Sequence, residues 1–222
     1  MTDPRELFRL GGIPSELAEL LQVEYVWQVL ERLDRFGPSI GHELRGNVHP
    51  TAIVNGAAYV AEDAEIGPYA LIDGPAWIGP GAFVGHAAFV RGPVVLMAGA
   101  RVGHASEVKR SVLLPGARAP HFNYVGDSVL GHAVNLGAGV KIANFKTFGD
   151  AIRMDGQETG LRKLGAAVGD DVSIGCNAVL SPGTIVGPRS VIYNGALVRG
   201  TIPPATVVKA RLEHEQVPLD GD

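Results

Sequence analysis

A six-residue repeat runs through most of the chain and limits its possible folds more than any other feature. From Val48 to Leu114, every sixth residue is Val, Ile or Leu. Up to Val108, the residue four places later is Ala or Ser at every step except Val94 and Val112. This period fits a short strand followed by a turn, and neither an α-helix nor an alternating strand. Three such units close a triangular coil of about 18 residues, and successive coils stack as parallel strands about 4.8 Å apart.

The repeat also predicts which side chains fill the interior of the coils. We expect the branched residues to point inward and the small residues to fit the corners, with glycine allowing turns that need positive φ. The first run of interior positions is Val48, Val54, Val60, Ile66, Ile72, Ile78, Val84, Val90, Leu96, Val102, Val108 and Leu114. After a break come Leu130, Leu136 and Ile142, then a polar excursion loop at 143–163, then Val168, Ile174, Leu180, Val186, Ile192 and Val198. Long loops inside a compact domain are often functional.

The segment before the repeat has a different pattern. Apolar residues recur at helical spacing across 15–36, with Ser15 as a suitable N-cap and Gly37-Pro38 as the end of the helix. The simplest role of this helix is to cap the open first coil, and contact with a subunit or partner is the alternative. We therefore divide the chain into a helical N-terminal segment (1–45), a β-helix domain (46–211) and a tail (212–222).

Composition excludes several classes of protein. The 222 residues carry 19 basic and 23 acidic side chains, a formal net charge of −4, so a basic surface for nucleic acid is not expected. Cys176 is the one cysteine, which rules out a disulfide framework and favours the reducing cytoplasm. Neither an apolar signal-peptide core nor an apolar run long enough to span a membrane is present.

In an 18-residue coil, residues 18 apart lie on the same face of adjacent coils. Arg91 and Lys109 have this spacing, and each follows an interior residue, so we expect two stacked cations. Such cations repel each other unless an anion lies between them, and a phosphate is a suitable anion. A ladder of salt bridges with Asp73 and Glu107 is the alternative, and spacing alone does not choose between the two.

Histidines mark two other places. His86 and His104 are also 18 apart, but zinc in a catalytic site needs three protein ligands, so we favour a plain stack of imidazoles over a metal site. His121 and Tyr124 lie where the repeat breaks, which predicts the lip of a pocket. Histidine is the residue type best suited to act as a base near neutral pH.

The stretch PHFNYVGDSVLGHAVNLGAGVKIANF (120–145) resembles the acetyltransferase half of the bifunctional N-acetylglucosamine-1-phosphate uridyltransferases. It is also similar to the archaeal-type sugar-1-phosphate nucleotidylyltransferase/acetyltransferases. The pattern H-x-x-Y-x-G-D, then V-N-x-G-A-G, then N carries the resemblance, which extends over 48–211. It implies an all-β fold, a left-handed parallel β-helix of hexapeptide repeats after a short helical segment. It further implies a homotrimer with sites between neighbouring subunits, and acetyl-CoA as co-substrate.

The same resemblance implies roles for individual residues. His121 matches the catalytic base, and a backbone N–H near 137–139 would stabilise the oxyanion. The positions that match residues for the sugar phosphate are Arg91, Lys109, Tyr124, Asn135, Asn144 and Lys163. The positions that match contacts with acetyl-CoA are Ala138, Cys176 and Arg211. No residue is assigned to a metal.

The sequence thus predicts an acetyl-CoA-dependent N-acetyltransferase that acts on a small amino-sugar 1-phosphate, of the glucosamine-1-phosphate or galactosamine-1-phosphate type. The nucleotidyltransferase domain of the family is missing, which leaves room for a separate nucleotidyltransferase as a partner. The loop between Asn144 and Lys163 is longer than in the bacterial enzymes, so the acceptor stays open. The alternatives are acyl transfer to another nucleotide-sugar or amine acceptor, a γ-carbonic-anhydrase-like metalloenzyme, and a non-catalytic β-helix assembly module.

Overall fold

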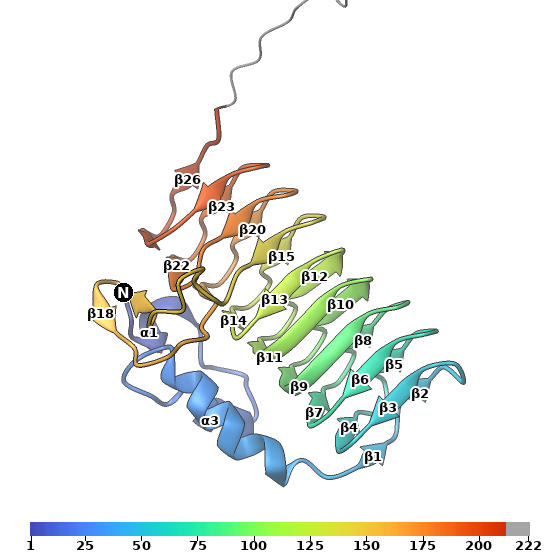
Figure 1. Cartoon of the computed structure of the whole chain (residues 1–222). Coiled ribbons are helices and arrows are strands. Elements are labelled where there is room, and N and C mark those ends of the chain that lie inside the picture. The colour runs from blue at the N-terminus through green and yellow to red at the C-terminus, as the bar shows by residue number, and fades with distance from the viewer. Residues whose placement is uncertain (212–222) are drawn as a thin grey trace, which may run out of the picture.

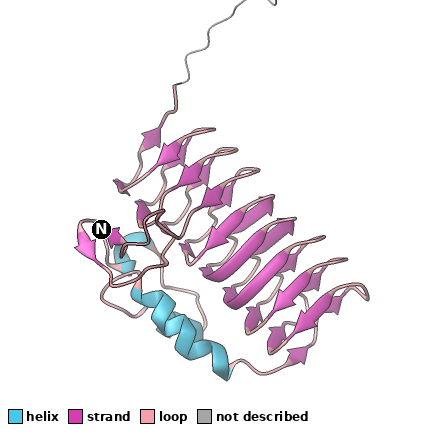
Figure 2. Cartoon of the chain, viewed as in Figure 1, coloured by secondary structure: helices cyan, strands magenta, loops and turns pink. Residues whose placement is uncertain are grey.

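The chain forms a left-handed parallel β-helix, described here by a computed structural model over residues 1–211. The tail predicted at 212–222 lies outside the described residues. Coils of short strands and turns stack along one axis, and a helical segment lies along one side of the stack (Figure 1). Every strand pairing between coils is parallel within residues 1–211, as the six-residue repeat predicts. Figure 2 shows that helix is confined to the N-terminal segment of the described chain.

The coils have three faces, which we number in chain order starting from the strand Asn47–Val48. Face 1 is one sheet of β2 (Asn47–Val48), β5 (Glu65–Ile66), β8 (Phe83–Val84), β10 (Arg101–His104), β12 (Arg118–His121), β15 (Asn135–Leu136), β20 (Ser173–Ile174), β23 (Val191–Ile192) and β26 (Val207–Val208). Face 2 contains β3 (Ile53–Asn55), β6 (Leu71–Asp73), β13 (Tyr124–Gly126), β16 (Lys141–Ile142), β21 (Val179–Leu180) and β24 (Leu197–Val198). Face 3 contains β1 (Glu43–Leu44), β4 (Ala58–Val60), β7 (Ala76–Ile78), β14 (Val129–Leu130), β19 (Ala166–Val168), β22 (Thr184–Val186) and β25 (Thr201–Ile202). The long strands β9 (Phe89–Leu96) and β11 (Glu107–Leu113) turn the corner from face 2 to face 3.

The interior is a column of branched side chains, as the repeat predicts. Every sixth residue from Val60 to Val108 is at most 1% exposed, and Val48 and Val54 are partly buried against the column in the first coil. The predicted positions after the break, from Leu130 to Val198, also lie in this core. Burying each such side chain favours folding by roughly 1.5–3 kcal/mol, so the column is the main stabilising element of the β-helix.

The prediction that Leu114 fills the interior is wrong, because the register between coils shifts by one residue before Leu114 is reached. Lys109 pairs with Arg91, but Ser111 pairs with Val94, so the register shifts between Lys109 and Ser111. Leu113 therefore fills the interior, whereas Leu114 and Val112 point outward into a second apolar cluster. The next coil has 17 residues between paired positions, as for Val112 and Val129.

The N-terminal segment covers the side of the β-helix and does not cap its end. It contains α1 (Pro4–Leu7), α2 (Ser15–Ala18), the 3₁₀ turn η1 (Glu19–Leu21), α3 (Gln28–Phe36) and the 3₁₀ turn η2 (Gly37–Ser39). The predicted single helix over 15–36 is thus interrupted, and α2 follows Pro14 as N-cap with no side-chain cap. Leu30 and Leu33 of α3 are fully buried in a cluster with outward residues of face 3, such as Val95. None of the helices in residues 1–211 is long and apolar enough to cross a membrane.

The excursion between β16 and β19 also packs against this side. It carries a small antiparallel hairpin of β17 (Arg153–Met154) and β18 (Gln157–Glu158). Met154 and Leu164 are buried in the same cluster as the N-terminal helices, and the Met1 ammonium pairs with Asp155 at 2.8 Å. The excursion and the N-terminal segment therefore form one layer over face 3.

Leu30→Ala should destabilise the protein by about 2–5 kcal/mol, because it leaves a cavity between α3 and face 3. Arg32→Ala, on the exposed side of the same helix, is the matched control and should change stability little. Urea denaturation followed by circular dichroism measures both. Equal midpoints for the two variants would show that α3 is not packed as described.

Candidate active site

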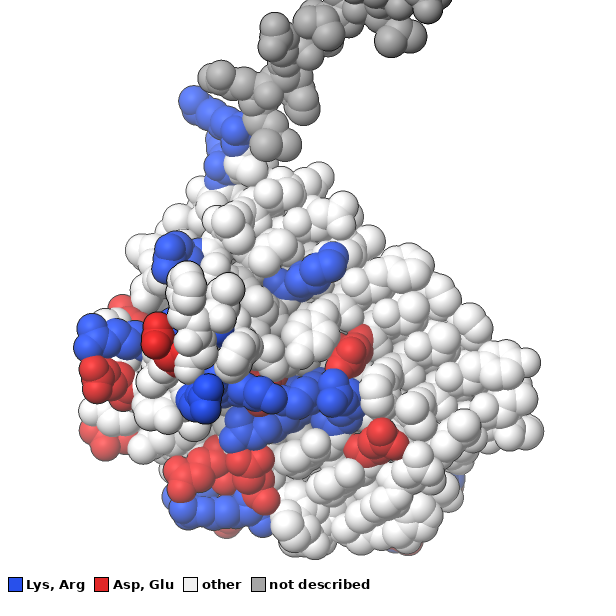
Figure 3. Space-filling view, in the orientation of Figure 1, with Lys and Arg blue, Asp and Glu red and all other residues white. Residues whose placement is uncertain are grey.

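Face 2 brings the two predicted cations together. Lys109 on β11 is in register with Arg91 on β9, as their spacing predicts. Both cations are paired with carboxylates: Arg91 Nη1 lies 2.6 Å from Glu107 Oε1, and Lys109 Nζ lies 3.0 Å from Asp127 Oδ2. The cations are thus in salt bridges, but not with the expected partners. Asp73 accepts a hydrogen bond from Asn55, and Glu107 pairs with Arg91 instead of Lys109. Figure 3 shows Lys and Arg side chains gathered in a band over β9 and β11.

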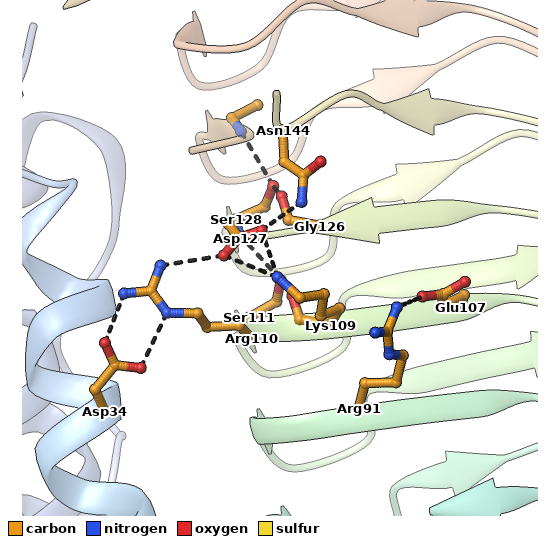
Figure 4. A network of polar contacts seen from close by, with 11 residues as sticks. Asp34, Arg91, Glu107, Lys109, Arg110, Ser111, Gly126, Asp127, Ser128 and Asn144 are labelled. Atoms are coloured by element: carbon orange, nitrogen blue, oxygen red, sulfur yellow. Dashed lines mark hydrogen bonds and ion pairs between the residues drawn. The ribbon is translucent and has the colours of Figure 1, made fainter. Parts of the chain in front are cut away.

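Asp127 is the centre of the polar contacts on this face. Its side chain is 1% exposed and accepts hydrogen bonds from Lys109, from Arg110 Nη1 at 3.1 Å and from Asn144 Nδ2 (Figure 4). Arg110 in turn pairs with Asp34 of α3. The sequence analysis missed Asp127 and Arg110 as site residues, although Asp127 is the last letter of the H-x-x-Y-x-G-D pattern. The signal that could have identified Asp127 was its position as a charged residue within this motif.

Tyr124 and Asn144 meet over a glycine. A Cβ on Gly126 would lie 2.6 Å from Asn144 Nδ2 and 2.7 Å from the Tyr124 hydroxyl, so only glycine leaves room for both groups. Burial raises the pKa of the Tyr124 hydroxyl above its ordinary value of 10.0, and the carboxylates of Glu107 and Asp127 raise it further. Tyr124 is therefore a neutral hydrogen-bonding group over the physiological pH range.

His121 lies at the corner between faces 1 and 2. It is exposed at the end of β12, in register with His104 and three residues before Tyr124 on β13. Its backbone N–H donates to Asn123 Oδ1 at 3.0 Å, and the Asn123 side chain donates to the Gly137 carbonyl at 2.7 Å. The backbone at His121 is thus fixed, while its imidazole faces solvent.

The other two histidines form the predicted stack. The rings of His86 and His104 are 4.8 Å apart and nearly parallel, with an Nδ1–Nδ1 distance of 2.8 Å. Phe122 packs edge-on against His104. Within residues 1–211, no group of three or more His, Cys, Asp or Glu side chains is arranged to hold a metal ion.

A groove of about 640 Å³ lies on face 1, near the C-terminal end of the β-helix. Its lining includes Asn135, Gly137, Ser173, Cys176, Tyr193 and Asn194. Asn135 and Cys176 are thus together, but Asn135 is on a different face from Arg91 and Lys109. Within one chain the structure does not join the predicted sugar-phosphate residues into a single cluster.

The backbone near 137–139 narrows the choice of oxyanion donor. The N–H of Gly137 donates to the Ile174 carbonyl at 2.6 Å, and that of Gly139 donates to the His121 carbonyl at 2.9 Å. In the described part of the chain, the Ala138 N–H has no backbone acceptor. Of the three predicted donors, Ala138 is therefore the one that is available.

The last two predicted site residues lie at the edges of the site. Lys163 is exposed at the end of the excursion, next to Leu164, whose N–H donates to the Asn144 carbonyl at 3.0 Å. Arg211 is exposed at the last described position. Lys163 is thus close in the chain to the face 2 cluster, whereas Arg211 lies beyond the face 1 groove.

Comparison with known proteins agrees with the fold and the motif. The family model for the bacterial transferase hexapeptide (six repeats) matches residues 165–200. A bifunctional sugar-1-phosphate nucleotidylyltransferase/acetyltransferase from Sulfurisphaera tokodaii is 39% identical over 157 residues, which cover 69% of this chain and 39% of that protein. The bifunctional protein GlmU from Methanococcus maripaludis is 44% identical over 184 residues, which cover 81% of this chain and 44% of that protein. Among solved structures, UDP-N-acetylglucosamine acyltransferase from Campylobacter jejuni has a TM-score of 0.44 and 16% identity, covering 71% of this chain and 69% of that chain.

The repeat and the coil define a hexapeptide-repeat protein. Its relatives are the bifunctional GlmU proteins and sugar-1-phosphate nucleotidylyltransferase/acetyltransferases, so the resemblance predicted from the sequence is confirmed. The chain spans less than half the length of these curated relatives. Every predicted site residue lies within the β-helix domain, 46–211.

The ionisation of Tyr124 should occur above pH 10.0, and Glu107→Gln should lower it by removing a nearby carboxylate. The absorbance titration of the wild type minus that of Tyr124→Phe isolates this group. The folded state binds the phenolic proton more tightly than the unfolded chain, so this contribution to stability is complete below pH 10.0 and is lost as the pH rises further. A midpoint at or below 10.0 would contradict the burial of Tyr124 beside two carboxylates.

Proposed function

We propose that the chain is an acetyl-CoA-dependent N-acetyltransferase that acts on an amino-sugar 1-phosphate. The observation that carries the proposal is the face 2 cluster, in which Lys109 and Asn144 bind Asp127 beside Arg91 and Tyr124. Charged donors held in one place are suited to orient a phosphate. The similarity to a bifunctional sugar-1-phosphate nucleotidylyltransferase/acetyltransferase, with 39% identity over 69% of this chain, supports the same function.

The reaction transfers an acetyl group from sulfur to nitrogen. The amine of the sugar attacks the thioester carbon, a C–N bond forms and the C–S bond breaks. In the proposal, His121 takes the proton from the amine and returns it to the CoA sulfur, a step that general base catalysis accelerates by about 10²–10⁴. The Ala138 N–H is our candidate donor to the oxyanion, because its neighbours Gly137 and Gly139 already donate elsewhere.

We further propose a homotrimer with each site between two neighbouring copies. Asn135 and Cys176 line the groove on face 1, whereas Lys109 and Asn144 belong to the cluster on face 2. A face 1 groove from one copy and a face 2 cluster from the next would complete one site. Under this proposal Cys176, Ala138 and Arg211 contact acetyl-CoA, and Asn135 and Lys163 reach the sugar phosphate.

The acceptor is the least constrained part of the proposal. Glucosamine-1-phosphate and galactosamine-1-phosphate are the first candidates, and other nucleotide sugars or amines are the second. A screen of acceptors by release of the CoA thiol separates them. We expect the reaction to take place in the cytoplasm, with a separate nucleotidyltransferase to use the product.

His121→Ala should lower kcat for acetyl transfer to an amino-sugar 1-phosphate by about 10²–10⁴, because the amine proton then has no side-chain acceptor. The control is His49→Ala, an exposed histidine in the first coil, which should keep the wild-type rate. The rate of thiol release compares the variants with the wild type. Undiminished turnover in His121→Ala would exclude this residue as the base.

Acetyl-CoA should protect Cys176 from alkylation by iodoacetamide. Cys176 is the only cysteine of the chain, and it is exposed in the face 1 groove, so the adduct reports on one place. At a concentration about ten times its dissociation constant, the nonreactive analogue desulfo-CoA should slow alkylation about tenfold, since few grooves then stay empty. Mass spectrometry gives the rate. An unchanged rate at saturating analogue would place CoA outside this groove.

A further inference from the structure

Arg110 connects the candidate active site to the N-terminal helix α3. Its Nε and Nη2 lie 2.9 and 2.6 Å from the two carboxylate oxygens of Asp34, and its Nη1 lies 3.1 Å from Asp127 Oδ1. Figure 4 shows the guanidinium between the helix and the cluster, with Lys109 on the far side of Asp127. Asp34, in the segment outside the β-helix, is therefore three contacts away from Lys109, the cation assigned to the phosphate.

The backbone of Arg110 is shaped for this connection. Arg110 occupies the shift in register between Lys109 and Ser111, with a φ of +43°. For a residue with a side chain, this conformation costs of order 1–3 kcal/mol and persists where the surroundings determine it. The shift keeps Lys109 on face 2 and directs Arg110 toward α3. These adjacent residues therefore bind the Asp127 carboxylate from different sides.

The carboxylate of Asp127 has no free position for another donor. Oδ1 accepts from Arg110 and Lys109, and Oδ2 accepts from Lys109 and Asn144, which together match the four lone-pair sites of a carboxylate. Any movement of the Arg110 guanidinium therefore changes what is available to the other two donors. Because guanidinium is planar with donors in a fixed fork, the two bonds to Asp34 set the direction of the third bond.

Asp34 also controls how strongly Arg110 competes for Asp127. With Asp34 present, Arg110 uses two nitrogens on the helix and one on Asp127. Without the Asp34 charge, the guanidinium is free to form a two-bond pair with Asp127, the geometry that arginine and carboxylate favour. Such a pair would displace Lys109 and Asn144 from the carboxylate that holds them.

We propose that Asp34 and Arg110 are positioning residues of the acceptor site, and that α3 is thus a working part of that site. The inference rests on the proposed function, because it assigns Lys109 and Asn144 to the sugar phosphate. The two bonds to Asp34 hold the Arg110 guanidinium so that it gives only one bond to Asp127. Asp127 can then hold the Lys109 ammonium and the Asn144 amide in place for the acceptor.

The test is Asp34→Asn, which keeps the shape of the side chain and removes its charge. The KM for the amino-sugar 1-phosphate should rise about tenfold, as expected when a charge-assisted contact with a phosphate is misplaced. The KM for acetyl-CoA should not change, and kcat should stay within about twofold, because the reacting atoms are not touched. Glu31→Gln is the matched control: Glu31 lies on the same helix in an exposed pair with Arg35, and its loss should leave every constant unchanged.

Further variants separate positioning from simple structural support. Asp34→Glu should restore most of the acceptor KM, because the charge returns. Arg110→Lys keeps the positive charge but cannot span two carboxylates, so it should raise the acceptor KM as Asp34→Asn does. This variant tests the same contact if Asp34→Asn folds poorly. Thermal melting of each variant gives the accompanying change in stability.

Three results would overturn the inference. Wild-type constants in Asp34→Asn and Arg110→Lys would reject it and leave the proposed function intact. Equal losses with both substrates, together with a lower melting temperature, would show that the pair only supports the fold. A wild-type protein that acetylates no amino-sugar phosphate would reject the proposed function and the inference together.

Discussion

Backbone register between coils is the constraint on which the rest of the structure depends. Parallel pairing places residues 17 or 18 positions apart side by side, so distant parts of the chain meet on one face. The register brings Lys109 next to Arg91 and, one coil further, sets Asp127 within reach of Lys109. The neighbours of a side chain on a β-helix face therefore follow from the number of residues in each coil. A coil that is one residue shorter changes the neighbours of the residues after the shift.

The layer over face 3 determines which surfaces remain for function. Outward residues there, such as Val95 and Ile185, are buried under the N-terminal helices and the excursion. Face 2 keeps Leu197 76% exposed, and face 1 keeps Val191 and Val207 exposed. Val191 and Val207 are neighbours on adjacent coils, and adjoining exposed apolar residues are suited to contacts between proteins. The groove and the cluster thus lie on the two faces that the layer leaves uncovered.

Sequence periodicity predicts the coil interior well and fails where two phases are equally apolar. From Val60 to Val108 every position of one six-residue phase is branched, but at 112–114 the run Val-Leu-Leu suits either phase. The one-residue shift at Arg110 therefore leaves no signal in the pattern. That shift creates the contacts of Arg110, which is why the sequence analysis omitted it. The side-on packing of the helices had a readable signal: strands such as 94–96 are apolar at every position, a pattern of strands buried on both sides.

The charges of the cluster cancel before any substrate is bound. Lys109 and Arg110 balance Asp127 and Asp34, and Arg91 is balanced by Glu107. A phosphate would therefore be recognised by the direction of hydrogen-bond donors more than by net positive charge. Lys109 has three donors and gives part of them to Asp127, which leaves the others in a fixed direction on a side chain that is 20% exposed. A flexible lysine loses side-chain entropy when it binds an acceptor. A buried carboxylate that already orients the lysine removes this entropic cost from the proposed binding step.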